Sequence, residues 1–372
     1  MKITDLKIRE LSAELPLSFS GGTYKLDRRS TLLCRITTDE GVVGEVCVGN
    51  ETGYSEHLKD VIRGKLRDLI MGQNPLDIER HWHNMLATTK EYADRASLMQ
   101  GIALIDTALW DLRGKFLKQP LWRLLGGYRN SVQMIGIGGY YQTSKDEKGI
   151  REEIAFYKEY GLAGIKFKVG ALSLEEDAER VRIVRAAGGN DFVIVVDSNM
   201  AWNPDDAERF ASMIKPLKPA WLEEPICSED IPLELHRLRQ KSYVKTAAGQ
   251  SELSVFEAHR LLVSESVDVL NVTYNRGGGV TGWVKIAAAA SFSNVDMAQV
   301  GEPHIGMHLI ASVPNTTYVE CYPDEKRDPF WAKLYSNLPR PENGFIKLTE
   351  EPGVGLSLRE DAVELFATEA WS

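Results

Sequence analysis

The spacing of hydrophobic residues changes character twice along the chain. At the start, hydrophobic and polar positions alternate in KITDLKIREL (2–11) and in STLLCRITTDEGVVGEVCVG (30–49), a period typical of β-strands. The second stretch contains Asp39-Glu40-Gly41, which predicts a hairpin turn. From about residue 55 to 125, hydrophobic residues recur at helical spacing, as in ASLMQGIALIDTALWDLRGKFLKQ (96–119). We therefore expect residues 1–128 to form an α+β domain.

After residue 129, short β-rich runs alternate with helix-forming stretches. Helices are predicted for REEIAFYKEYG (151–161), SLEEDAERVRIVRAAGG (173–189) and DDAERFASMIKPL (205–217). The β-rich runs lie 20 to 29 residues apart and end near Tyr141, Lys168, Asp197, Glu223, Gln250, Tyr274, Val300 and Glu320. Repeated βα units of this length place parallel strands side by side. Eight of them, without a dinucleotide-binding glycine pattern, favour a closed (β/α) barrel over residues 129–325.

The length of the chain agrees with this division. A chain of 372 residues is too long for one small domain and suits two domains, or one large barrel with additions. Residues 326–372 return to strand and turn patterns, in DPFWAKL and in NGFIKLTEEPGVGLSL. We expect this last segment to pack back on the N-terminal domain.

Composition narrows the possible partners. The net charge is −9 and the isoelectric point is about 5.5, which argues against a nucleic acid or an acidic membrane surface as the main partner. No apolar run is long enough to span a membrane, and the first residues alternate like a strand, unlike a signal peptide. Four cysteines without CxxC spacing suit a reducing compartment and argue against a structural zinc site. These features predict a cytoplasmic protein.

Charged residues gather at the predicted strand ends, where barrel enzymes carry their active sites. One strand contains Lys166 and Lys168, which share a face because they are two residues apart. The following strands end in VIVVDSN and WLEEP, and the last ends in TTYVECY. These endings contribute Asp197, Asn199, Glu223, Glu224 and Glu320. Any single carboxylate here is as readily explained by helix capping or an ion pair, whereas the whole set favours an active site.

Such a set of side chains suits one kind of chemistry. Asp and Glu oxygens hold a hard divalent cation, Mg²⁺ or alternatively Mn²⁺, and leave positions open for substrate. A metal and a second ammonium group lower the pKa of a nearby lysine, which then acts as a base. Metal and base together remove a proton α to a carboxylate, because positive charge stabilises the enediolate that forms.

The motifs KFKVG, VDSN, WLEEP and GGGVTGW, with DTALWDLRGKFLKQPLWRLLGG and PGVGL, resemble the mandelate racemase and muconate lactonizing enzyme branch of the enolase superfamily. The likeness covers nearly the whole chain. It implies a modified (β/α)7β TIM-like barrel, with an N-terminal α+β capping domain completed by the C-terminal segment. It also implies one divalent metal, a small-molecule carboxylate substrate and a homo-oligomer. The chemistry of this superfamily, a Lys or His base working with Mg²⁺, agrees with the residues present.

The resemblance also implies a role for each residue that matches its motifs. Lys168 resembles the base, and Lys166 resembles its partner, which neutralises the substrate carboxylate. Asp197 and Glu223 resemble the first two metal ligands, and Glu224 resembles a supporting acid. Asn199 and Glu320 resemble groups that hydrogen-bond the substrate, Glu320 as a protonated donor in one interpretation.

The sequence departs from the family pattern at the third metal ligand. The family has a glutamate after a glycine, where this chain has TAAGQSEL and therefore Gln250. An amide oxygen is a weaker ligand than a carboxylate because it is neutral. Glu252 has the same strand parity and is the alternative if the chain stays extended. A third alternative is an altered or absent metal site.

A second departure concerns the wall opposite the lysines. The positions of the family's second acid–base pair, an Asp and a His, fall near Thr273 and Val300. His304 comes a turn later and is a candidate general acid, as is Glu302, whereas His308 suits helix packing. Racemisation needs groups on both faces of the substrate, so the sequence favours a lyase that dehydrates an acid sugar.

Two alternatives stay open at this point. One is an isomerase, either a cycloisomerase or an epimerase of a sugar-derived acid or lactone. The other is a catalytically degenerate binding protein of the same fold. In each case we expect the stretches LPLSFSGGTYKLDRR (15–29) and VGNETGYSEH (48–57) to form mobile flaps, from which Tyr24 and Tyr54 contact the substrate.

Overall fold

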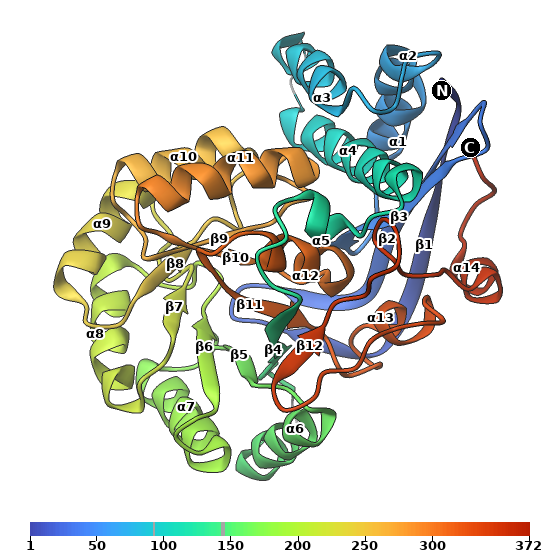
Figure 1. Ribbon diagram of the computed structural model, residues 1–372. Helices are drawn as coiled ribbons and strands as arrows, with labels where there is room; N and C mark the ends of the chain where they lie inside the picture. Colours follow the sequence, from blue (N-terminus) through green and yellow to red (C-terminus); the bar gives the residue numbers. More distant parts are fainter. Residues whose placement is uncertain (92–93, 143–145) are drawn as a thin grey trace.

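A computed structural model describes residues 1–91, 94–142 and 146–372 of the chain (Figure 1). The chain begins with a three-stranded antiparallel sheet in the order β1-β2-β3. Its strands are β1 (Ile3–Ser20), β2 (Lys25–Thr38) and β3 (Val43–Glu51). The helices that follow are α1 (Glu56–Val61), η1 (Ile62–Leu66), α2 (Arg67–Ile70), α3 (Ile78–Ala87), η2 (Thr88–Glu91), α4 (Arg95–Leu117) and α5 (Leu121–Leu124). The predicted α+β arrangement is therefore present.

Helix α4 lies directly against the sheet. Gly44 on β3 allows this contact, because a Cβ at that position would lie only 2.2 Å from the backbone oxygen of Ala108. Asp111 lies one helical turn further along α4 and accepts from the Glu45 N–H at 2.9 Å. The sheet and the helix thus pack together as one unit, which we call the capping domain.

Eight parallel strands form a closed barrel, because the last strand pairs with the first. The strands are β4 (Ser131–Gly138), β5 (Gly164–Lys168), β6 (Val193–Asp197), β7 (Trp221–Glu223), β8 (Thr246–Ala248), β9 (Val269–Val272), β10 (Asp296–Gln299) and β11 (Thr316–Cys321). The helices between them are α6 (Glu147–Tyr160), α7 (Leu174–Gly188), α8 (Pro204–Ile214), α9 (Ile231–Lys241), α10 (Val255–Val263), α11 (Gly279–Phe292) and α12 (Pro303–Ser312), with the short η3 (Lys215–Leu217) after α8. This is the predicted (β/α)7β barrel.

The final segment contributes to both parts of the molecule. Its elements are α13 (Pro329–Lys333), β12 (Phe345–Lys347) and α14 (Glu360–Phe366). Strand β12 pairs antiparallel with barrel strand β4, while Ala367 bridges to Leu11 on β1. The sequence did not predict the two short helices α13 and α14. For α13, the start signal is limited to Pro329 directly after the capping residue Asp328. The division into residues 1–128, 129–325 and 326–372 stays an interpretation of this architecture.

The first predicted flap is part of the sheet. Residues 15–29 form the ends of β1 and β2, with Phe19 paired to Leu26 across the strands, so only a tight turn joins them. The hairpin reaches across the barrel (Figure 1) and contacts it where the Tyr141 N–H donates to the Ser20 carbonyl at 2.8 Å. This stretch therefore extends the two predicted strands instead of forming a separate loop.

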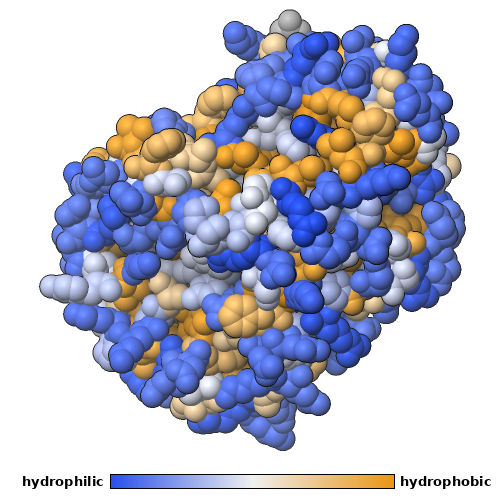
Figure 2. All heavy atoms as spheres, viewed as in Figure 1, coloured by the Kyte–Doolittle hydropathy of each residue, from blue (hydrophilic) through white to orange (hydrophobic). Residues whose placement is uncertain are grey.

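The surface agrees with the mixed composition of the chain. Figure 2 shows a mostly hydrophilic face, with hydrophobic residues gathered between the capping domain and the barrel helices next to it. Among the described residues, no helix has both the length and the apolar character needed to cross a membrane.

Candidate active site

Two lysines lie side by side inside the barrel on one face of β5. Lys166 and Lys168 are 1% and 3% exposed, and they point the same way because residues two apart on a strand share a face. The parallel register pairs Lys168 with Asp197 on β6, and Asp197 with Glu223 on β7. Three neighbouring strands therefore end at one level with two ammonium groups and two carboxylates.

Lys166 is surrounded by carboxylates. Its Nζ lies 2.9 Å from Glu223 Oε1, 2.9 Å from Glu320 Oε2 and 3.6 Å from Asp197 Oδ2. Burial disfavours the charge of Lys166, but these three carboxylates outweigh it and raise the pKa of Lys166 well above its ordinary value. Glu320 Oε2 also accepts from the Gly301 N–H at 3.0 Å. A role of Glu320 as a hydrogen-bond partner of the substrate stays a prediction.

Lys168 has one main counter-ion. Its Nζ lies 2.5 Å from Asp197 Oδ2 and donates to Asn199 Oδ1 at 2.9 Å. Burial lowers the pKa of Lys168, but Asp197, together with Tyr24 and Tyr140, outweighs burial, so that this pKa is raised overall. The lowering of this pKa by a bound metal, which the sequence predicted, stays a prediction, and the second ammonium group of Lys166 does act in that direction.

The two carboxylates on β6 and β7 differ in their electrostatics. Burial raises the pKa of Asp197, but Lys168 and Lys166 more than offset it, and the pKa is lowered overall. Burial raises the pKa of Glu223 to about 7 against the attraction of Lys166. The indole Nε1 of Trp221, two residues earlier on the same face, donates to Glu223 Oε2 at 3.0 Å. Asp197 is thus the more strongly anionic of the two groups.

Glu224 fixes the loop that follows β8. Its Oε1 accepts from the backbone N–H groups of Gly249, Gln250 and Ser251 at 3.0, 2.9 and 3.3 Å. The loop leaves the side-chain Oε1 of Gln250 buried without a hydrogen-bond partner in the described part of the chain. A buried acceptor without a partner is costly, so this oxygen is available for a ligand.

Glu252 does not continue the strand. Strand β8 ends at Ala248, and Gly249 has a φ of +129°, so the chain turns and the parity argument for Glu252 fails. Glu252 lies close enough to Glu224 to raise the pKa of Glu224, which burial raises first, to about 8. Its Oε2 is nevertheless buried without a hydrogen-bond partner among the described residues.

The donor set fits a single hard cation only if the amide takes part. Within residues 1–91, 94–142 and 146–372, no three His, Cys, Asp or Glu side chains are grouped to hold a metal. Asp197 and Glu223 supply two carboxylates on neighbouring strands, and Gln250 supplies the unpartnered oxygen. Oxygen donors of this kind are those that Mg²⁺ prefers, so these three residues fit the implied ion.

The wall facing the lysines carries neutral polar groups. Strand β9 lies four strands from β5 in the eight-stranded ring and is therefore opposite it. It contains Asn271 and is followed by Thr273, and Asn271 Oδ1 and Thr273 Oγ1 are buried without hydrogen-bond partners in the described residues. Val300 follows the next strand. No acid–base pair stands on this wall among the residues named by the sequence pattern.

His304 and Glu302 hold the capping domain to the barrel. The Nε2 of His304 donates to the Cys47 carbonyl on β3 at 2.7 Å. Glu302 Oε1 accepts from the Gly49 N–H and from the Tyr274 hydroxyl. Both proposed acids are thus engaged in contacts between the two parts of the molecule, and neither is bonded to the lysine cluster in this structure.

Comparison with known proteins agrees with this geometry. The model for the mandelate racemase and muconate lactonizing enzyme N-terminal domain matches residues 3–126. The model for the enolase C-terminal domain-like family matches residues 149–362. The chain belongs to this family.

Two characterised relatives show the range of activities in the superfamily. An arabinonate dehydratase of Saccharolobus solfataricus is 29% identical over 335 residues, which are 88% of each chain. A 3,6-anhydro-α-L-galactonate cycloisomerase of Streptomyces coelicolor is 30% identical over 79% of each chain. A crystal structure of a family member from a marine actinobacterium, in complex with magnesium, is 35% identical over 99% of both chains with a TM-score of 0.92.

The hairpin that joins β1 and β2 lies against the barrel beside the candidate site. Gly22 lies so close to the barrel that a Cβ would come within 2.5 Å of the Val169 backbone oxygen and 3.0 Å of the Ser198 oxygen. Thr23 Oγ1 donates to the Asn199 carbonyl at 2.9 Å. The next residue, Tyr24, places its ring 5.5 Å from Lys168 Nζ.

Tyr54, the second predicted substrate contact, lies differently. Its hydroxyl donates to the Val48 carbonyl at 3.3 Å, so the side chain folds back over the end of β3. Gly49 provides the space, since its φ of +105° and missing Cβ leave room for the Tyr54 hydroxyl. A contact between Tyr54 and a substrate stays a prediction.

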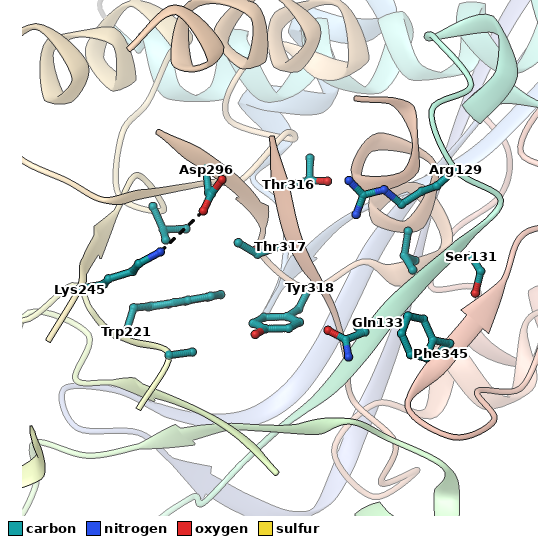
Figure 3. Close-up of a pocket in the computed structure, with 13 residues that line it drawn as sticks. Arg129, Ser131, Gln133, Trp221, Lys245, Asp296, Thr316, Thr317, Tyr318 and Phe345 are labelled. Atoms are coloured by element: carbon teal, nitrogen blue, oxygen red, sulfur yellow. Dashed lines mark ion pairs between the residues drawn. The ribbon is translucent and has the colours of Figure 1, made fainter. Parts of the chain in front are cut away.

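The opposite end of the barrel contains a separate pocket of about 570 Å³ (Figure 3). The rings of Trp221 and Tyr318 stack there with centroids 5.6 Å apart. Lys245 and Asp296 form an ion pair of 3.8 Å at its edge. Trp221 thus separates this pocket from Glu223, to which its indole donates.

The sequence did not single out three groups that contact the cluster or surround it. Trp221 and Asn271 share the inward face with the strand-end residues, so strand parity alone could have found them. Asn271 Nδ2 approaches Glu320 Oε1 at 3.4 Å. The third group is Tyr140, Tyr322 and Arg327, which contact one another from the ends of two strands and left no local signal in the sequence.

His308 is a buried histidine on α12 that contacts two other segments of the chain. Its Nδ1 accepts from the Trp122 N–H at 3.2 Å and its Nε2 donates to the Val354 carbonyl at 3.0 Å, so the neutral ring satisfies both contacts. Burial lowers the pKa of His308 to about 4.

Acidification should therefore destabilise the fold through His308. Between pH 6.5 and 4 the unfolded state binds the proton and the folded state does not, so stability falls as pH falls. From pH 7 to 5 this histidine should remove about 2 kcal/mol from the free energy of unfolding. Urea titrations at both pH values should show that the free energy of unfolding falls less in His308→Gln than in wild type. The exposed control His83→Gln should lose as much as wild type. An equal loss in all three proteins would contradict the role given to His308.

Proposed function

We propose that the protein is a lyase that removes the α-proton of an acid-sugar carboxylate with Lys168 and expels the β-hydroxyl as water. One observation carries this proposal. The lysines stand with three carboxylates on one side of the barrel, while the opposite wall offers neutral Asn271 and Thr273. A racemase needs a proton donor on each face of the substrate, and an elimination does not.

The residues present divide the work as follows. Lys166 binds the substrate carboxylate through charge, and Asn199 and Glu320 hold its polar groups. Lys168 Nζ takes the α-proton, and as an ammonium group it returns this proton to the departing β-hydroxyl on the same face. The α C–H and β C–O bonds break, a C=C bond forms, and the resulting enol tautomerises to a 2-keto acid. Asn271 and Thr273 accept or donate to the sugar hydroxyls.

We further propose that Asp197, Glu223 and Gln250 hold one Mg²⁺, with Mn²⁺ as a substitute. Bound there, the cation would take up the carboxylate charge that now raises the pKa of both lysines, and would place positive charge beside the substrate carboxylate. Support comes from the unpartnered Gln250 oxygen and from the magnesium in a relative of 35% identity. Calorimetric titration should show weaker Mg²⁺ binding by Gln250→Leu.

The experiment that tests the function follows the α-hydrogen. The protein is incubated with Mg²⁺ and a panel of acid sugars in D₂O, and exchange is followed by NMR while 2-keto product is trapped with semicarbazide. A lyase gives both exchange and trapped product. A cycloisomerase or epimerase, the second candidate because of the cycloisomerase relative, gives exchange without a 2-keto product. Absence of exchange with every acid, together with no bound metal, would support the degenerate binding protein.

The capping hairpin should control turnover through its close approach. Gly22→Ala would force the turn away from the Val169 oxygen and shift Tyr24 with it. We expect kcat/KM to fall by about 100-fold, the usual effect of an ångström-scale misplacement, with an unchanged melting temperature. Gly53→Ala is the matched control, because a Cβ there meets nothing within 4 Å, and it should behave like wild type.

The remaining proposals concern partners and location. We propose that the protein works as a cytoplasmic homo-oligomer on a small carboxylate, without a nucleic-acid or membrane partner. Support for assembly comes from large apolar side chains on the surface, among them Phe292, Tyr243 and Val263 at 91%, 85% and 71% exposure. Light scattering after gel filtration tests the oligomeric state.

A further inference from the structure

Arg327 is a buried cation without a counter-ion. It is 3% exposed and follows the last barrel strand. Its Nε donates to the Tyr140 hydroxyl at 3.2 Å, and its guanidinium lies 4.3 Å from the centre of the Tyr322 ring. Its Nη1 is buried without a hydrogen-bond partner, and no carboxylate of the described residues forms an ion pair with it.

The other buried cations of the described chain show how unusual this is. Each of the other lysines and arginines less than a tenth exposed has a carboxylate within 4 Å, in the pairs Arg9–Glu364, Arg29–Asp328, Lys59–Glu10, Lys166–Glu223, Lys168–Asp197 and Arg180–Asp177. A buried charge is strongly unfavourable unless it is paired. Aromatic faces compensate part of the cost of burying the charge, but they carry no net charge. Arg327 therefore lacks the anion that each of the other buried cations has.

Arg327 belongs to the surroundings of the lysines. Arg327 is bonded to Tyr140, and the ring of Tyr24 lies 5.5 Å from Lys168 Nζ. Both Arg327 and Lys168 lower the pKa of Tyr140 against the effect of burial. Strand β11, which leads to Arg327, is separated from β5 by β4 alone. The two strands are therefore about 10 Å apart, which is comparable to the length of an extended sugar acid. An anion bound to Arg327 would therefore be the far end of a molecule whose near end meets Lys166.

We propose that Arg327 binds a second carboxylate of the substrate, so that the protein acts on sugar acids oxidised at both ends. A guanidinium binds a carboxylate through two parallel hydrogen bonds, and the unpartnered Nη1 supplies a donor for this. The Tyr140 hydroxyl fixes the orientation of Nε, and Asn50 of the capping domain fixes Tyr322 by donating to its hydroxyl at 3.0 Å. This proposal rests on the lyase function proposed above and names its substrate class.

The test compares substrates that differ only at the far end. Turnover with Mg²⁺ is measured for galactarate against D-galactonate and for D-glucarate against D-gluconate. Wild type should prefer the diacid of the productive pair by about 100-fold in kcat/KM, as expected for a pair of charged hydrogen bonds. Arg327→Met should lose this preference through a raised KM for the diacid, with little change for the monoacid. Arg327→Lys should restore part of it.

Melting temperatures distinguish substrate binding by Arg327 from a purely structural role. Arg327→Met removes an unpaired charge, so its melting temperature should equal or exceed that of wild type. The control Arg29→Met leaves Asp328 unpaired and should lower the melting temperature while affecting both substrates of a pair equally. A preference of wild type for monoacids, or an equal loss on both substrates in Arg327→Met, would overturn the assignment and leave the lyase function standing. If no acid undergoes exchange, the lyase function fails. The binding role of Arg327 is then tested by the melting temperature with added diacid. Stabilisation of wild type but not of Arg327→Met would support it, and equal effects on both proteins would overturn it.

Discussion

Lys168→Ala should abolish both the exchange of the substrate α-hydrogen in D₂O and the formation of 2-keto product. The ammonium of Lys168 lies in the ion-pair cluster at the end of β5, and the facing wall offers Asn271 and Thr273, which cannot replace it as a base. A positioned proton-transfer group contributes a factor of 10² to 10⁴, so a loss of about 10³-fold in kcat is expected. The measurement is the NMR exchange rate at saturating Mg²⁺ and substrate.

The matched variant for this experiment is Lys168→Arg. A guanidinium keeps the positive charge beside Asp197 but does not give up its proton near neutral pH. We therefore expect Lys168→Arg to keep the wild-type melting temperature and to lose exchange as completely as Lys168→Ala. Exchange near the wild-type rate in the arginine variant would show that Lys168 acts by charge, and that the proton is removed by another group.

The second large effect concerns the stability of the same cluster. In metal-free protein, Asp197→Asn removes the main counter-ion of buried Lys168 and one of three from Lys166. Breaking a buried pair by removing one partner typically reduces the free energy of unfolding by about 3–5 kcal/mol. Urea unfolding in the presence of a chelator measures this difference directly.

The pH dependence gives this prediction a second readout. The folded-state pKa of Asp197 is lowered, so its contribution to stability is present above the unfolded pKa and is lost as pH falls through the folded value. The difference between wild type and Asp197→Asn should therefore shrink at strongly acidic pH.

A second Lys–Asp pair at the other end of the barrel provides the control. Asp296→Asn disrupts the ion pair of Asp296 with Lys245, and these two side chains are 44% and 58% exposed, respectively. Exposed pairs contribute less than about 1 kcal/mol, so this variant should unfold almost like wild type. Equal losses in the two variants would mean that the cluster around Lys168 is solvated, contrary to its burial.

The sequence predicted those parts of the site that follow from strand parity. Lys166 and Lys168 share a face because they are two residues apart, and Asp197 and Glu223 end the next two strands, so the parallel register had to bring them together. The same rule failed for Glu252, because a glycine with positive φ ends β8 before the parity reaches it. It could not locate His304 either, whose partner Cys47 lies 257 residues away.

By itself, the sequence determined the barrel, the capping domain and the ring of charged strand ends, because hydrophobic period and side-chain alternation are local properties of a strand or helix. Only the tertiary structure decided which charges are compensated. Whether Lys168 meets Asp197, whether Gln250 keeps an unpaired oxygen and whether Arg327 has any anion depend on segments that are far apart in the chain. Burial and Coulomb interactions act through space, and the residues that the chain leaves unpaired are those that a substrate or an ion would complete.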